Sequence, residues 1–517
     1  MKSPSSRWLA LFGAGLLSIT VAPARDKWIA ARSPHFEMFS SASESDSRDL
    51  LNKLEQFRAT VLAIYPLPRF YDPKTTIVLF ATDRQFKPYK PLFDGRAANV
   101  AGYCTGGFDE TMITMTADND SEQTDEIIFH EYVHLLIGST GDTMPLWLNE
   151  GLAELFSTFK IVGDSYEMCR EKPEHTNLLR NSHLMPLGEL FAVTRQSSDY
   201  NEGTRQGIYY AESWAFVHFM VCGKESESAD YLSRLSRFNE LIASPNAPIH
   251  RSFREAFGMD YDEMERELGR YLNGGSYRYK RGRLVLGDLA SQIKFRPAGD
   301  FERDVALINL RWRVRDSGDA AYQLLQLAQS HPESPLPHEV LAAVAWKSDD
   351  TEVALGHWQR AAELGSDNPF VYVRLAADRL NRLSMGLSLD YRMPEELAGT
   401  LRGWLDRAIT LSPRWLEAYE KLAMVEAFAE QPRVDAANRA QEAAPKMRDK
   451  TRTLFAIAVI HWRVGDDAGA RQIAEFLIAA PETSPQLRSL AKQLKKRLAL
   501  KNPPAAPVAA APAGKAS

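Results

Sequence analysis

Apolar positions in the first half of the chain follow strand periods in some segments and helix periods in others. Strands are predicted at residues 28–31, 35–39, 75–81 and 112–116, the first two as a hairpin, and glycines at 102, 106 and 107 indicate a loop before the last strand. A polar helix is predicted over about 47–64, and helices alone are indicated after residue 121. This mixture favours an α+β domain over residues 25–290.

Strand patterns disappear after about residue 300, where Ala and Leu recur at helical spacing. Prolines that would separate these helices stand at positions 337, 369, 413, 445 and 481. The intervals between them are 32, 44, 32 and 36 residues, and three of the four lie near the period of about 34 residues that is typical of tetratricopeptide (TPR) repeats. The segment 407–423 also resembles that repeat. We therefore expect an all-α, TPR-like helical-repeat domain over residues 300–500, with an irregular all-helical domain as the alternative.

The two ends of the chain differ in composition from both expected domains. Positive charges at the start precede an apolar stretch at residues 8–22, which is too short for an ordinary transmembrane helix and ends in small residues. This pattern predicts a cleavable signal peptide over residues 1–24 and a periplasmic or secreted protein; an uncleaved N-terminal membrane anchor is the alternative. The Ala- and Pro-rich tail at residues 501–517 is expected to be disordered.

Charge and short motifs give no basis for several functions. The 517 residues carry 62 basic and 67 acidic side chains, and the net charge of −5 does not indicate nucleic-acid binding. The sequence has no Gly-rich phosphate loop and no Cys-x-x-Cys pair. After export, Cys104, Cys169 and Cys222 would meet an oxidising compartment, where three cysteines can form at most one intramolecular disulfide. The sequence leaves open which two would pair.

The clearest chemical signal is the sequence His-Glu-Tyr-Val-His at residues 130–134. On a helix, His130 and His134 lie one turn apart and can direct two imidazoles at one zinc ion. Glu131 stands beside the first histidine and can take a proton from a water molecule at that metal. Apolar neighbours predict a mostly buried helix, where imidazoles need a partner. The alternative is a surface helix whose two histidines bind nothing.

A second helix is expected to complete the ligand set. Pro145 suits its first turn, and the helix carries Trp-Leu-Asn-Glu-Gly at residues 147–151. Glu150 and Glu154 share one face of this apolar helix, so we expect Glu150 to be the third zinc ligand. Glu154 and Asn149 would lie behind the ligands, with Glu154 accepting a hydrogen bond from a ligand imidazole. Two His and one Glu leave the fourth position of one Zn²⁺ open for water. The alternative is a pair of solvated carboxylates.

These two motifs resemble those of the gluzincin superfamily of zinc metallopeptidases. The string at residues 147–151 is close to the form found in zinc aminopeptidases, while the short gap between His134 and Glu150 is more similar to the bacterial peptidase-MA-like group. The resemblance covers about residues 26–280 and implies a gluzincin-like (thermolysin-like) catalytic domain. The Gly-x-Met-Glu-Asn motif that captures a free amino terminus in the aminopeptidases is absent, so both endopeptidase and atypical exopeptidase activity stay open.

The resemblance also implies roles outside these two helices. The segment 209–219 is similar to the helix that carries a transition-state-stabilising tyrosine, which makes Tyr210 the candidate donor to the oxyanion; a core aromatic residue is the alternative. His218 on the same helix is expected to be packed rather than catalytic. In gluzincins the strand before the zinc helix is an open edge that pairs with substrate backbone. In this sequence that strand contains Met112, Ile113 and Thr114.

Taken together, these features predict a zinc metallopeptidase that hydrolyses peptide bonds with a metal-activated water. Glu131 would be the base, and Tyr210 would help to stabilise the oxyanion. The helical repeats would bind a peptide or protein substrate, or a partner protein. The alternative is a TPR-type protein-binding scaffold whose peptidase-like domain is inactive on proteins.

Overall fold

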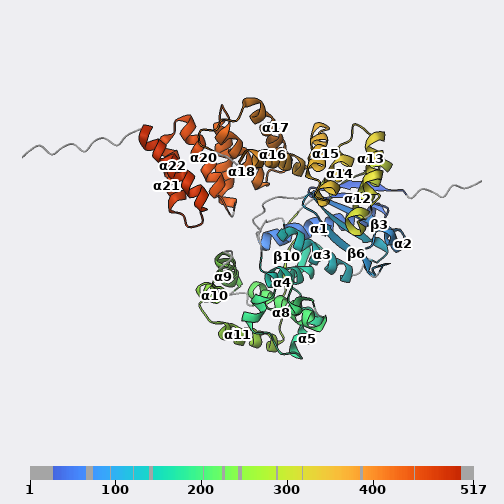
Figure 1. The fold of residues 1–517 in the computed structure, drawn as a ribbon. Helices are drawn as coiled ribbons and strands as arrows, with labels where there is room; N and C mark the ends of the chain where they lie inside the picture. Colours follow the sequence, from blue (N-terminus) through green and yellow to red (C-terminus); the bar gives the residue numbers. More distant parts are fainter. Residues whose placement is uncertain are drawn as a thin grey trace, which may run out of the picture.

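The computed structural model describes most of the chain, which folds into a mixed α/β part followed by an all-helical part (Figure 1). The described ranges are 27–65, 74–93, 95–119, 122–138, 144–201, 203–223, 228–242, 247–286, 289–316, 318–384, 388–447 and 449–501. The expected signal peptide and the Ala/Pro-rich tail lie outside these ranges. Among the helices in these ranges, none combines the length and the apolar composition needed to cross a bilayer.

A six-stranded mixed sheet forms the centre of the first part. Its strands are β1 (Ile29–Arg32), β2 (Glu37–Ser40), β3 (Lys74–Phe80), β6 (Gly102–Gly106), β7 (Glu110–Thr116) and β11 (Lys294–Pro297). The order is β11–β1–β2–β3–β7–β6; β2, β3 and β7 run parallel, and the other neighbours pair antiparallel. The predicted hairpin is confirmed, with Ala30 opposite Phe39. Strand β11 extends the sheet beyond residue 290, where we had expected the domain to end.

The sheet order corrects one expectation about substrate binding. Met112, Ile113 and Thr114 lie in β7, which is paired on one side with β3 and on the other with β6, so these residues form no open edge. The strand at the end of the sheet is β6, where Thr105 lies opposite Met112. All of β7 is buried, as an interior strand covered on both faces should be. The Gly-rich sequence of β6 has weak strand propensity, so the sequence alone indicates a loop where the structure has this strand.

Helices pack on both faces of the sheet. Those of the first part are α1 (Glu44–Ile64), α2 (Asp83–Phe86), α3 (Glu122–Gly138), α4 (Leu146–Ser157), α5 (Pro173–Arg180), α6 (Leu187–Ala192), α7 (Ser198–Asn201), α8 (Gly203–Cys222), α9 (Ser228–Leu241), α10 (Ile249–Phe257) and α11 (Tyr261–Gly274). On one face, Ile77 and Ile113 pack with α1 and α3. On the other, Val78 and Met112 pack with Leu310 of α12 (Asp300–Arg315). Successive strand residues thus alternate between two cores, and α12 belongs to the second.

Two smaller sheets and one disulfide complete the first part. The smaller sheets contain β4 (Leu92–Phe93) and β5 (Arg96–Ala97), and β8 (Lys160–Val162), β9 (Ser165–Met168) and β10 (Lys280–Arg283). Cys169, just after β9, is bonded to Cys222 at the end of α8. Cys104 on β6 is a free thiol. The structure therefore selects one of the three pairings that the sequence had left open.

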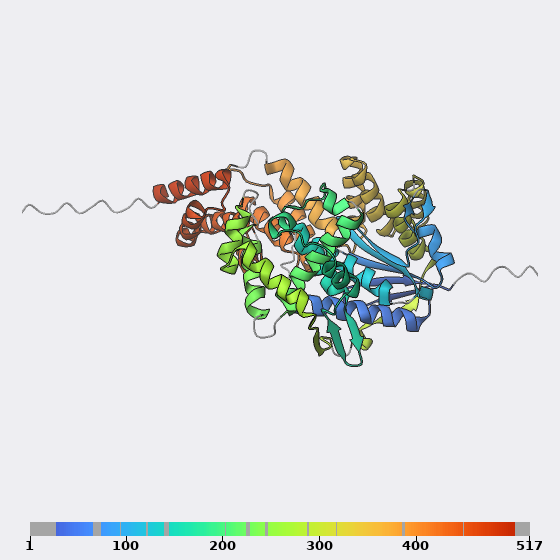
Figure 2. The same cartoon turned by 90° about the horizontal axis from the view of Figure 1, so that it is seen from below.

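The second part consists of successive helices that lead away from the sheet (Figures 1 and 2). After α12 come α13 (Ala320–Ser330), α14 (Leu336–Lys347), α15 (Thr351–Glu363), α16 (Pro369–Ser384), α17 (Glu395–Leu411), α18 (Leu416–Phe428), α19 (Val434–Ala443), α20 (Thr451–Val464), α21 (Asp467–Ala479) and α22 (Pro485–Lys501). Pro337 and Pro369 lie in the first turns of α14 and α16, so these prolines begin alternate helices. Gly465 ends α20 with φ 89°, and the Asp466 side chain caps α21, as expected for a tight turn between paired helices.

Candidate metal centre

Helices α3 and α4 bring together the three residues that the sequence nominates as zinc ligands. The Nε2 atoms of His130 and His134 lie 3.0 Å apart. The Oε2 atom of Glu150 lies 3.3 Å from Nε2 of His134 and 3.6 Å from Nε2 of His130. Tetrahedral zinc with bonds of about 2.0–2.2 Å holds its donor atoms roughly 3.3–3.5 Å apart. The three observed separations bracket that range, so this donor set can share one ion.

Residues of α4 orient the two histidine rings through contacts with their Nδ1 atoms. Asn149 Oδ1 lies 2.6 Å from Nδ1 of His134, and Glu154 Oε1 lies 3.4 Å from Nδ1 of His130. Because both oxygens are acceptors, they favour a proton on each Nδ1 and leave both Nε2 lone pairs facing Glu150. Oε2 of Glu150 is buried and accepts no hydrogen bond from any side chain that the structure describes. Three converging acceptors with no donor between them fit a cation.

The electrostatics of Glu150 agree with a ligand role. Burial alone would raise the pKa of its carboxyl, but the two imidazoles, when they carry a proton on Nε2, outweigh burial and hold the pKa at about 2. The same contact acts in the opposite sense on His134, where burial lowers the pKa and Glu150 raises it above the usual value. Glu150 therefore stays ionised at neutral pH, as a metal ligand must be.

Glu154 is held by two residues that sequence reasoning missed. Lys172 Nζ donates to its Oε2, and His175 Nε2 lies 3.1 Å from the same atom. Burial raises the pKa of Glu154, but His175, Lys172 and His130 together lower it to about 2. Lys172 and His175 come from the start of α5 and stand 18 and 21 residues from Glu154 in the chain. No local spacing in the sequence could have linked them to the motif.

Tyr200 on α7 is a third residue that the sequence did not reveal. Its hydroxyl donates to Oε1 of Glu150 at 3.1 Å, so one carboxylate oxygen is held by a phenol while the other faces the imidazoles. Tyr210 on α8 lies beside the same cluster. Its ring centroid is 6.4 Å from that of His130 and 6.0 Å from that of Tyr200. The structure thus places the candidate oxyanion donor at the rim of the site, half-buried.

His218, two turns further along α8, is separate from the metal centre. Its side chain is fully buried, with Nε2 2.9 Å from the carbonyl oxygen of Cys169 and Nδ1 2.6 Å from the hydroxyl of Tyr271. Burial lowers its pKa to about 4, so it is neutral at physiological pH. His218 is packed in the core, as expected.

Close helix packing explains the glycine of the Trp-Leu-Asn-Glu-Gly string. A Cβ atom on Gly151 would lie 2.5 Å from the carbonyl oxygen of Ser213 and 2.5 Å from Cγ2 of Val217. Only glycine lets α4 approach α8 this closely. That approach brings Glu150 on α4 and Tyr210 on α8 to the same cluster.

The edge strand β6 lies against the helix that carries Glu131. Cβ atoms on Gly102 and Gly106 would come within 2.9 Å of Ile128 and 2.6 Å of Leu135 on α3. Burial raises the pKa of the Cys104 thiol on β6, and the charge of Glu131 raises it further. Glu131 is half-buried, and its charge raises the pKa of both Cys104 on β6 and His134. The candidate base therefore influences both the edge strand and one candidate ligand.

A known family matches part of the chain. Residues 126–241 match a family described as a protein of unknown function (DUF1570). No curated protein matches the chain. The matched segment begins in α3 and ends with α9, and it contains all three candidate ligands together with Tyr200 and Tyr210.

Proposed function

We propose that the protein is an exported zinc metallopeptidase that hydrolyses peptide bonds, with a gluzincin-like catalytic domain and a TPR-like helical region. The observation that carries this proposal is the convergence of Nε2 of His130, Nε2 of His134 and Oε2 of Glu150, with no hydrogen bond to that buried oxygen from the described part of the chain. Two nitrogens and one oxygen are the donor set of catalytic rather than structural zinc, because they leave a coordination position for water.

The roles of the protein's own groups follow from their positions. A bound Zn²⁺ supplies Lewis-acid activation of water. Glu131 accepts the proton of the attacking water and returns it to the leaving nitrogen of the cleaved bond. Tyr210 donates its phenolic hydrogen to the oxyanion that develops on the substrate carbonyl. Asn149 and Glu154 fix the two imidazoles, and Tyr200 fixes Glu150.

The position of β6 favours a peptide as the substrate. Its outer side ends the sheet, so it can offer backbone N–H and C=O groups to an extended chain. Because β6 packs directly on α3 at Ile128 and Leu135, a chain added to this edge would lie close to the zinc helix that carries Glu131. Backbone pairing binds peptides with few demands on their side chains, while specificity would come from the pockets beside it.

Metal analysis combined with one variant tests the proposal. The purified protein should contain close to one zinc per chain and should cleave a mixed peptide library. Glu131→Gln should keep the zinc and lose at least about 10²-fold in cleavage, because the amide cannot accept the water proton. A wild-type protein without bound zinc, or a Glu131→Gln variant with undiminished cleavage, would refute the assignment.

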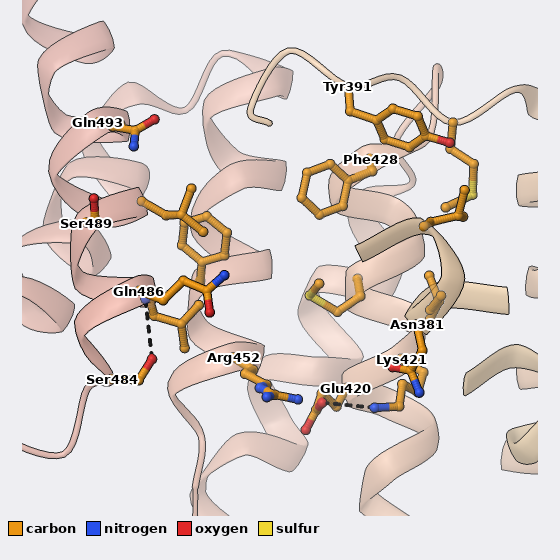
Figure 3. Close-up of a pocket in the computed structure, with 17 residues that line it drawn as sticks. Asn381, Tyr391, Glu420, Lys421, Phe428, Arg452, Ser484, Gln486, Ser489 and Gln493 are labelled. Atoms are coloured by element: carbon orange, nitrogen blue, oxygen red, sulfur yellow. Dashed lines mark hydrogen bonds and ion pairs between the residues drawn. The ribbon is translucent and has the colours of Figure 1, made fainter. Parts of the chain in front are cut away.

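A second function, protein binding by the helical region, is favoured by one cavity. A space of about 600 Å³ lies between α16, α18, α20 and α22 (Figure 3). Tyr391 and Phe428 form an aromatic side of it, while Arg452 and Gln486 contribute polar groups. Its volume is in the range of ordinary ligand pockets. In this reading the helices are a scaffold, and the metal centre is inactive on proteins.

The two functions can be separated in the full-length protein. If the protein is only a scaffold, the wild type should bind peptides on an array without cleaving any of them, and Arg452→Glu should abolish this binding. If the peptidase proposal holds, cleavage should depend on Glu131 and should survive Arg452→Glu. Arg452 is exposed, so this substitution leaves the helical core intact.

A further inference from the structure

The turn between β6 and β7 contacts the helical region with almost every residue. Gly107 N–H donates to the carbonyl oxygen of Glu110 at 2.9 Å and closes the turn. The ring of Phe108, about a third exposed, lies among three aromatic rings of α14, α15 and α16. Their centroids are 5.3 Å away for Phe370, 6.1 Å for Trp346 and 6.4 Å for Trp358.

Polar groups of α12 hold the same turn. Arg313 Nη2 donates to Oδ2 of Asp109 at 2.6 Å, and both side chains are more than nine-tenths buried. Asn309 Nδ2 donates to Oε2 of Glu110 at 2.7 Å, and Asn309 Oδ1 accepts from Nε of Arg313 at 2.9 Å. A Cβ atom on Gly107 would lie 2.2 Å from Nη1 of Arg313, so the guanidinium rests on the turn backbone. Buried, hydrogen-bonded ion pairs of this kind hold one geometry.

The other end of this contact is the free edge of the sheet. The turn directly continues β6, whose five residues pair with β7 on one side only. The glycines of β6 bring it against α3, beside Glu131. An edge strand with a single partner is the least constrained strand of a sheet, so its position depends on what holds its ends.

We infer that the helical region sets the position of the β6 edge through the turn Gly107–Glu110, and that Phe108 and Arg313 are positioning residues for the peptide that binds along β6. This inference rests on the proposed peptidase function for its substrate, but not for the mechanical link itself. The helices α12–α16 are then part of the peptidase site rather than an appended module. Their contacts hold β6 in a fixed position against α3, so an extended substrate binds to an edge that is already formed.

Hydrogen exchange of the full-length protein tests the link without any assay of activity. In Phe108→Ala, the backbone amides of residues 102–106 should exchange roughly 10-fold faster than in wild type, because one end of β6 has lost its aromatic anchor. The matched control is Phe301→Ala, which removes an aromatic contact with His331 elsewhere in the helical region. That variant should leave the exchange of β6 unchanged.

Steady-state kinetics then test the consequence for substrate. Phe108→Ala should raise KM for an extended peptide several-fold and leave kcat nearly unchanged, because Glu131 and the ligands do not move. Phe108→Tyr should restore both exchange and KM, since a phenol ring can make the same aromatic contacts. Arg313→Lys, which keeps the charge but loses the two-pronged contact, should show the same effect as Phe108→Ala.

The outcomes separate this inference from the proposed function. Unchanged exchange of β6 in both Phe108→Ala and Arg313→Lys would overturn the link. Faster exchange with an unchanged KM would overturn the positioning role. If the wild-type protein cleaves no peptide, the proposed function fails, and the exchange measurement still decides whether the helical region holds β6.

Discussion

The side-chain oxygen of Asn149 lies 2.6 Å from Nδ1 of His134, while the next residue, Glu150, points its Oε2 at the opposite nitrogen of the same ring. Two consecutive residues of α4 therefore contact both sides of one imidazole of α3. Asn149 favours a proton on Nδ1, and Glu150 faces the nitrogen that would bind the metal. The geometry of the candidate ligands thus depends on the register between the two helices.

Substitution of Asn149 tests this arrangement. Asn149→Ala removes the acceptor for Nδ1 of His134, so the ring can rotate and its tautomer is no longer fixed. We expect zinc affinity to fall by about 10–100-fold, measured by competition with a chromogenic chelator. Asn149→Asp keeps an acceptor at the same distance and should bind zinc at least as well as wild type. Equal affinity of the alanine variant and wild type would contradict the role of Asn149.

The contact between α4 and α8 predicts a stability effect at Gly151. An added Cβ would lie 2.5 Å from a backbone oxygen that cannot move without shifting α8. Gly151→Ala should therefore lower stability by about 1–3 kcal/mol, despite the better helix propensity of Ala, and should lower the thermal midpoint.

A matched control for Gly151 lies in α15. A Cβ atom on Gly356 would meet no atom within 4 Å, so Gly356→Ala should be neutral or stabilise by up to about 1 kcal/mol. Thermal unfolding of both variants under the same conditions checks the pair. A Gly151→Ala variant as stable as Gly356→Ala would show that the close approach of α4 and α8 is not required.

Local patterns in the sequence predicted the parts of the site that local geometry determines. The spacing of His130 and His134 and the apolar positions around them predict one face of a helix, and α3 has that form. Pro145 marks the start of α4, which begins at the next residue. Glu150 is predicted as the third ligand because a carboxylate on the next, apolar helix needs a partner when it is buried.

Other parts of the site depend on contacts between residues that are distant in sequence. Tyr200 donates to Glu150 from a position 50 residues away, and no spacing rule connects them. The resemblance to gluzincins implies that the strand before the zinc helix, which is β7, is the open edge, whereas β6 forms that edge and consists largely of small and polar residues with a weak strand signal. The order of strands in a sheet is a tertiary property, and the sequence of a single strand does not reveal it.

The disulfide predicts a specific distribution of thiols. Cys169 and Cys222 are bonded across a separation of 53 residues, and Cys104 remains a thiol. Alkylation of the unfolded, non-reduced protein should therefore label one cysteine, identified by peptide mass as Cys104. Replacing both bonded cysteines by serine should lower stability by about 4 kcal/mol, since the unfolded chain gains loop entropy. A label on Cys169 or Cys222 would contradict the pairing.

A buried carboxyl on α8 predicts how stability depends on pH. Burial raises the pKa of Glu212 to about 8, the neighbouring Glu265 adds to this, and the N–H of Met185, which donates to Oε1 at 2.5 Å, opposes it. The other oxygen, Oε2, has no hydrogen-bond partner among the groups that the structure describes. The folded protein thus keeps a proton on Glu212 at neutral pH, whereas the unfolded chain loses it near pH 4.5.

The sign of the effect follows from this difference. Between pH 4.5 and pH 8 the folded state binds one more proton than the unfolded state, so stability falls as pH rises through this window and levels off above it. From pH 5 to pH 8 the loss is on the order of 3 kcal/mol.

Glu212→Gln resembles the protonated carboxyl and does not titrate, so it should be close to wild type at pH 5 and clearly more stable at pH 8. Thermal midpoints of both proteins at the two pH values, with zinc at saturation so that metal binding cancels, measure the difference. A gap between variant and wild type that stays constant from pH 5 to pH 8 would show that Glu212 is already ionised in the folded protein, and that a counter-charge or water reaches its second oxygen.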